Sequence, residues 1–151
     1  MYGDKGQVPE NEYTIPIGEA DVVKEGNDVT LVSVGKMMKL ANEVAALMAK
    51  ENVSVEVIDL RTVRPIDYQK IVDSVKKTNR LVIVEETWPL ASITTEVAFH
   101  IQKHAFDYLD APVTRVNSMD VPLPYAPTLI EAILPSVKRT VDAINAVMYR
   151  S

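Results

Sequence analysis

Hydrophobic positions along the chain follow two alternating patterns. Short apolar runs rich in β-branched residues predict strands at about 29–34, 53–60, 81–84 and 113–118. Between and after these runs, apolar residues recur every three or four positions, which is the spacing of one helical face. Because strands and helices alternate, we expect a three-layer α/β/α sandwich with a mostly parallel sheet.

The ends of the predicted helices carry sequence signals. One helix should occupy about 36–50, and Asp67 is placed to cap the next. Thr128 and Glu131 form a capping-box pattern for a short helix near the end of the chain. Pro135 suits the first position of the last helix.

Residues 1–28 differ from the rest of the chain. Glycines and prolines are frequent in this segment, and they interrupt regular structure. We interpret 1–28 as an extended arm or linker and 29–151 as a single α/β domain, which the length supports.

Composition and charge narrow the possible functions. The net charge is -5, so the chain lacks the basic excess typical of nucleic-acid-binding proteins. It contains no cysteine, which excludes disulfides and thiolate chemistry. Neither a signal-peptide pattern nor a membrane-spanning run of about 18 apolar residues is present. We therefore expect a cytoplasmic protein without nucleic-acid or membrane partners.

The turn after the first predicted strand argues against nucleotide binding. Gly35 is the one glycine in this turn, residues 33–37, whereas dinucleotide-binding and phosphate-binding loops need several glycines. The turn also lacks the acidic pair that a receiver domain would need for its phosphoacceptor site. Gly35 is better suited to a simple strand-to-helix turn.

For two groups of titratable residues, the sequence pattern favours a structural role over a catalytic or metal-binding one. His100 and His104 share a helical face with Glu96, but they do not form an H-E-x-x-H metal motif. Glu85 and Glu86 end a strand, where adjacent side chains point to opposite faces. They therefore should not converge on one substrate, although one of them can orient a loop at the carboxyl edge of the sheet. We assign no catalytic, cofactor-binding or metal-binding residue to this chain.

Two aromatic residues are candidates for partner docking. Trp88 follows the acidic pair, and Tyr125 lies in a proline-rich loop. Exposed aromatics on loops are typical interface anchors. Aromatics that merely cover the edge of the core would have the same sequence pattern, so both interpretations stay open.

Several segments, in order, carry a family resemblance. They include Tyr2-Gly3, Val8-Pro9 and the stretches 13–20, 26–35, 55–67, 74–78, 84–86 and 120–125, of which 55–67 is the most specific. Together they resemble the C-terminal domain of the transketolase-like family. The resemblance is strongest to the beta subunit of the decarboxylating component of 2-oxo acid dehydrogenase complexes, such as pyruvate dehydrogenase.

The resemblance implies an oxidoreductase that decarboxylates a 2-oxo acid, with pyruvate favoured, and passes the acyl group to a lipoyl-acyltransferase. In the family, thiamine diphosphate and magnesium lie between an alpha-subunit domain and the N-terminal pyrimidine-binding domain of the beta subunit. This chain matches neither domain, so alone it should be inactive and bind no cofactor. The native gene should then encode about 180 further residues upstream, given usual domain sizes.

The resemblance also implies partners. The family assembles as an α2β2 heterotetramer of alpha subunits and two beta subunits, and it docks the basic subunit-binding domain of the lipoyl-acyltransferase. Asp110 is our acidic docking candidate, because a carboxylate facing an arginine makes a charge-assisted contact. A solvated turn at Asp110 is the alternative.

The chain by itself has one further expected property, and two alternative assignments stay open. With its interfaces exposed, it should self-associate, most simply as a symmetric dimer. A branched-chain 2-oxo acid or acetoin dehydrogenase beta subunit is an alternative within the family. A stand-alone, non-catalytic α/β interaction module is the alternative outside it.

Overall fold

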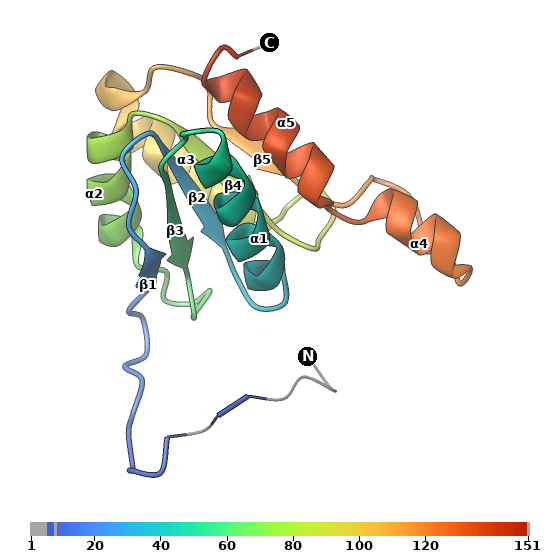
Figure 1. The fold of residues 1–151 in the computed structure, drawn as a ribbon, viewed down its shortest axis with the longest axis horizontal. Helices are drawn as coiled ribbons and strands as arrows, with labels where there is room; N and C mark the ends of the chain where they lie inside the picture. Colours follow the sequence, from blue (N-terminus) through green and yellow to red (C-terminus); the bar gives the residue numbers. More distant parts are fainter. Residues whose placement is uncertain (1–5, 8, 151) are drawn as a thin grey trace.

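A five-stranded sheet forms the centre of the computed structural model, which describes residues 6–7 and 9–150. The strand order is β1-β3-β2-β4-β5 (Figure 1). Four strands run parallel, and β1 pairs antiparallel with β3. The mostly parallel sheet confirms the predicted fold class. The strands are β1 (Asp21–Lys24), β2 (Val29–Ser33), β3 (Val55–Asp59), β4 (Leu81–Val84) and β5 (Thr114–Val116).

Helices cover both faces of the sheet and form two apolar cores. α1 and α5 pack on one face and α2 and α3 on the other (Figure 1). β2 and β4 are buried on both faces, and β4 accordingly appears in the sequence as a continuous apolar run. The helices are α1 (Met37–Lys50), α2 (Tyr68–Thr78), α3 (Ile93–His104), the 3-10 helix η1 (Phe106–Tyr108), α4 (Pro127–Ile133) and α5 (Val137–Val147). None of the helices in the described part of the chain combines the length and hydrophobicity that a bilayer crossing requires.

β1 lies inside the segment that we expected to be an arm without regular structure. Asp21 at its start pairs with Arg61 at 2.6 Å, and its backbone extends the sheet beyond β3. Gly26 then carries the chain so close to the backbone of Val55 and Glu56 that any Cβ would collide with it. Residues 9–17 lead away from the sheet with exposed side chains (Figure 1). The resemblance at Tyr2-Gly3 and Val8 lies outside the described residues.

The start of α2 agrees with the sequence prediction, whereas the start of α4 does not. The Asp67 side chain accepts a hydrogen bond from the backbone N–H of Lys70 at 3.1 Å, so Asp67 is the expected cap. The capping box at Thr128 was wrong, because α4 begins at Pro127 and its cap residue makes no side-chain hydrogen bond. Proline has a fixed φ and no N–H, so it suits the first helical position and places Thr128 inside the helix.

The start of α5 also differs from the prediction. Pro135 precedes the helix rather than opening it. Ser136 is the cap, and its hydroxyl accepts a hydrogen bond from the backbone N–H of Arg139 at 3.2 Å. A serine cap satisfies an N–H that the helix itself leaves unpaired, which explains why the helix begins at Val137, two residues after Pro135.

An ion pair between a buried carboxylate and a partly exposed lysine ties α2 to β3. Glu56 is only 2% exposed, and its carboxylate contacts Lys77 and accepts a hydrogen bond from the N–H of Gly26. Burial acts to raise the pKa of Glu56, but hydrogen bonds led by that from Lys77 outweigh burial and hold this pKa below its usual value. The same hydrogen bond raises the pKa of Lys77, which also reaches Glu25 at 3.0 Å.

Candidate functional site

The two glutamates that directly follow β4 diverge, as the sequence predicts. Glu85 is buried, and its carboxylate accepts a hydrogen bond from the backbone N–H of Thr94 at 3.0 Å. Glu86 is exposed and lies 3.6 Å from the Nζ of Lys36. Glu85 therefore orients the loop between β4 and α3, and the pair does not form an acid–base couple.

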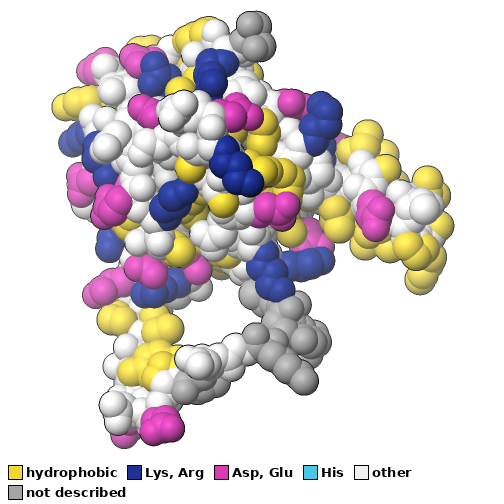
Figure 2. Space-filling model, in the orientation of Figure 1, with side chains coloured by type: hydrophobic (Ala, Val, Ile, Leu, Met, Phe, Trp, Pro, Cys, Tyr) yellow, Lys and Arg dark blue, Asp and Glu magenta, His cyan; other side chains and the backbone are white. Residues whose placement is uncertain are grey.

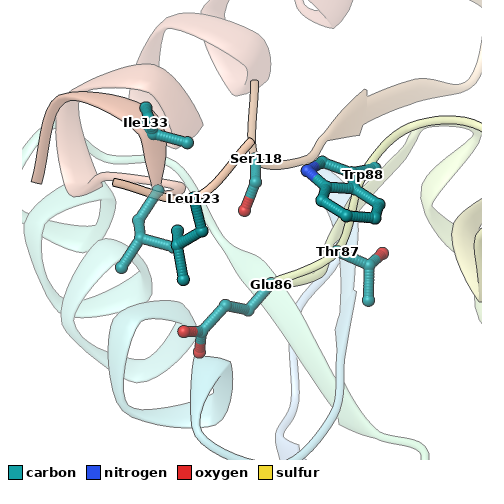
Figure 3. A pocket seen from close by; sticks show the side chains of 7 residues that line it. Glu86, Thr87, Trp88, Ser118, Leu123 and Ile133 are labelled. Carbon is teal, nitrogen blue, oxygen red and sulfur yellow. The ribbon is translucent and has the colours of Figure 1, made fainter. Parts of the chain in front are cut away.

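A pocket of about 310 Å³ opens at the carboxyl edge of the parallel strands (Figure 3). Its wall combines the loop after β4, the segment after β5 and the end of α4. Figure 3 shows Trp88 and Leu123 on opposite sides, with Glu86 between them at the base. The indole N–H of Trp88 donates a hydrogen bond to the Val121 carbonyl at 3.0 Å, which joins the two loops. The lining residues are Glu86, Thr87, Trp88, Ser118, Leu123, Ile133 and Leu134.

The pocket continues into exposed apolar side chains, which we call the α4 surface. α4 projects from the body of the protein, and hydrophobic side chains cover much of it (Figures 1 and 2). Trp88 is 54% exposed, and Tyr125 is fully exposed. Both residues are therefore accessible to a partner, as an interface anchor requires. The α4 surface consists of Trp88, Leu90, Leu123, Tyr125 and Leu129.

The third docking candidate, Asp110, lies elsewhere. Its backbone N–H donates to the carbonyl of Asn79, which places it at the amino edge of the sheet, opposite the α4 surface. Its carboxylate already pairs with Arg80 at 3.0 Å, and the Tyr149 hydroxyl donates to its carbonyl. The structure thus brings Trp88 and the Pro-rich loop together but does not bring Asp110 to them.

The histidines of α3 belong to a stack of rings. His100 stacks on Tyr68 of α2, with ring centroids 3.9 Å apart, and its ring is 4.3 Å from that of His104. Burial lowers the pKa of His100, with help from the charges of His104 and Lys103. Within the described ranges 6–7 and 9–150, no three His, Cys, Asp or Glu side chains are grouped to hold a metal ion.

The residues present do not fit a magnesium-bound diphosphate. The turn after β2 carries the single glycine Gly35, and the carboxylates of Glu85 and Glu86 contact Thr94 and Lys36 and do not converge. A diphosphate cradle needs several converging backbone N–H groups and acidic metal ligands.

Sequence reasoning overlooked the arginines and hydroxyls of this edge. Arg115 and Arg139 bridge loops through backbone carbonyls, and the Thr94 hydroxyl pairs with Asn117. The contacts of Arg115 with Pro89, of Arg139 with Asn117 and of Thr94 with Asn117 each join residues more than 20 positions apart, so no local pattern signals them.

The chain belongs to the family described as transketolase, C-terminal domain, which matches residues 18–140. It is 46% identical over 151 residues to the pyruvate dehydrogenase E1 component subunit beta of Rhizobium meliloti, covering 99% of this chain and 33% of that protein. The acetoin:2,6-dichlorophenolindophenol oxidoreductase subunit beta of Bacillus subtilis is 44% identical, covering 93% and 41%. The chain thus spans less than half of the length of these curated relatives.

A solved structure supports the same fold. The protein titled "Split gene transketolase, inactive beta4 tetramer" superposes with a TM-score of 0.80 and is 26% identical. The match covers 95% of this chain and 46% of that one.

Proposed function

We propose that this chain is the C-terminal assembly and docking domain of the beta subunit of a thiamine-diphosphate-dependent 2-oxo acid dehydrogenase. The identity of 46% to a pyruvate dehydrogenase beta subunit, sustained over nearly the whole chain, carries the proposal. The whole enzyme would decarboxylate pyruvate and transfer the acyl group to a lipoyl-acyltransferase. An acetoin dehydrogenase is the second candidate, favoured by the 44% identity to the Bacillus subtilis protein.

In this proposal the chain contributes binding surface, while thiamine diphosphate and magnesium are held by the other domains of the enzyme. The α4 surface supports an assembly role, because it is favourable for a partner to bury exposed apolar side chains such as Trp88 and Leu123, which line one pocket. The alpha subunit and a second beta subunit of an α2β2 tetramer are the partners we propose for it. Without them, two copies would cover this surface in a dimer, and the relative solved as a beta4 tetramer supports such self-association.

Docking of the basic subunit-binding domain of the acyltransferase is a separate part of the proposal. Asp110 is half exposed, and its partner Arg80 holds it in place without hiding it. An incoming arginine would share this carboxylate with Arg80. Such an exposed contact should depend strongly on salt, because its charges are screened within about 10 Å at 0.1 M ionic strength.

Calorimetric titrations test the proposal. We expect no heat from thiamine diphosphate with magnesium, and saturable, salt-sensitive binding of the subunit-binding domain of a matching acyltransferase. Asp110→Asn should weaken this docking, whereas Asp142→Asn, which removes an equally exposed carboxylate of α5, should not. Tight cofactor binding by this chain alone would contradict the proposal, and equal losses in the two variants would remove Asp110 from the docking surface.

A further inference from the structure

A second hollow, of about 500 Å³, lies beside the edge strand β5, next to the segment that follows it. It is distinct from the apolar pocket, although Ser118 borders both. Three charged side chains line this hollow: Arg115 from β5, Asp120 from the following loop and Arg139 from α5. The hollow therefore has an excess of one positive charge in a chain whose net charge is -5.

Arg115 is held by only one of its terminal nitrogens. Its Nη1 donates to the Pro89 carbonyl at 3.0 Å and to the Thr95 hydroxyl at 2.6 Å. Arginine has five N–H donors, and those on Nε and Nη2 form a fork that matches two oxygens of a carboxylate or phosphate. Within the described residues, this fork makes no hydrogen bond, so the guanidinium is oriented and still has its bidentate edge available.

Arg139 adds a second charge from a half-buried position. Its Nη1 donates to the carbonyls of Ile133 and Leu134, and its Nη2 donates to the carbonyl of Asn117 at 2.7 Å. These acceptors are neutral. Across the part of the chain that the structure describes, neither Arg139 nor Arg115 pairs with a carboxylate, and partial burial strengthens the field of an uncompensated charge.

We propose that this hollow binds a small oxyanion, a phosphate or carboxylate group, through the fork of Arg115 with Arg139 contributing charge. Asp120 opposes binding and sets the affinity low enough for reversible occupancy. This site is independent of the α4 surface and of the docking role proposed above.

Titration with inorganic phosphate, and separately with acetate, tests the proposal at constant ionic strength set with sodium chloride. The readout is the amide chemical shifts of Ser118 and Asp120 in ¹H–¹⁵N spectra. We expect saturable shifts with at least one of the anions, and the ratio of the two affinities identifies which oxyanion the site prefers. Shifts that do not saturate with either anion would overturn the proposal.

Three variants assign the binding to Arg115. Arg115→Gln should weaken the affinity by about tenfold or more, because hydrogen bonds to charged groups contribute about 1.5–3 kcal/mol and 1.4 kcal/mol is tenfold. Arg115→Lys should give an intermediate loss, since lysine keeps the charge without the fork. Lys138→Gln is the matched control, because it removes one exposed positive charge of α5 that does not line the hollow. Equal losses in Arg115→Gln and Lys138→Gln would overturn the proposal.

Asp120→Asn provides a test that does not depend on removing a structural contact. With the opposing carboxylate neutralised, affinity should rise by about threefold, as expected for an exposed charge–charge interaction. An unchanged or weaker affinity would contradict the proposed site, even if Arg115→Gln failed to fold.

Discussion

The carboxylate of Glu85, at the end of β4, accepts a hydrogen bond from the backbone N–H of Thr94 in the first turn of α3. Ser92, the cap residue of α3, makes no capping hydrogen bond with its own side chain. Glu85 therefore caps the helix from outside, where the first N–H groups lack partners and a negative charge is favourable. This contact fixes the two ends of the loop that carries Trp88.

Removing this external cap should loosen both the helix and the loop. We expect Glu85→Ala to lower the free energy of unfolding by about 1–3 kcal/mol, because it leaves a buried N–H unsatisfied. Glu85→Gln retains an acceptor oxygen and should cost less. Chemical denaturation measures both changes. If the alanine variant were as stable as the wild type, the hydrogen bond to Thr94 would not be a stabilising contact.

The ion pair between Glu56 and Lys77 should make stability depend on acid. Because the folded-state pKa of Glu56 is lowered, its contribution is complete above its ordinary pKa of 4.5 and is lost as the pH falls through the lower folded value. Glu56→Gln should lower the free energy of unfolding at pH 7 by about 2 kcal/mol. It should also flatten the dependence of stability on pH below 4.5.

Denaturation curves at several pH values test this prediction against an exposed pair. Asp142→Asn breaks the contact of Asp142 with Lys138, whose side chain is 85% exposed, and should change stability by less than about 0.5 kcal/mol. Equal changes in the free energy of unfolding for the Glu56 and Asp142 variants would show that burial of the Glu56 carboxylate does not strengthen its pair with Lys77.

Ser136 and Thr128 should respond differently to the same kind of substitution. Ser136→Ala removes the cap of α5 and should cost about 1 kcal/mol of stability. Thr128→Ala should cost less than about 0.5 kcal/mol, because Thr128 lies inside α4 and does not cap it. Thermal unfolding followed by circular dichroism compares the two variants. The reverse order of losses would restore the capping box that the sequence suggested.

The ring stack on α3 should make the stability of the protein depend on the protonation of His100. The pKa of His100 should lie below 6.5, mainly because of burial and secondarily because of His104 and Lys103. Because the unfolded state then protonates this imidazole more readily than the folded state, the free energy of unfolding should decrease as the pH falls from 6.5 toward the folded-state pKa of His100. His104→Asn should raise the pKa of His100, as followed by NMR of the imidazole protons. An unchanged pKa would exclude an electrostatic contribution from His104.

The sequence was sufficient to predict the central layers of the fold but not its edges. β2 and β4 are buried on both faces, so apolar and β-branched residues dominate both strands and make them recognisable in the sequence. β1 has only four residues, begins with Asp21 and ends with Lys24, and pairs along one side only. An edge strand of this kind has little apolar pattern, and it was missed for that reason.

The candidate site shows a similar division. The divergence of Glu85 and Glu86 follows from the alternation of a strand, and the exposure of Tyr125 agrees with its place in a Pro-rich loop. The pairing of Asp110 with Arg80 joins residues 30 positions apart, so only the folded arrangement reveals it. The open fork of Arg115 likewise depends on three-dimensional contacts with the loop after β4.

A chimeric beta subunit tests the proposed function most directly. In it, residues 18–140 of this chain replace the matching segment of the Rhizobium meliloti protein, and the chimera is expressed with its cognate alpha subunit. We predict a tetramer by sedimentation, with pyruvate decarboxylation retained because the cofactor would be bound by the other domains. A folded chimera that does not assemble with the alpha subunit would contradict the assignment of this chain as an assembly domain of that enzyme class.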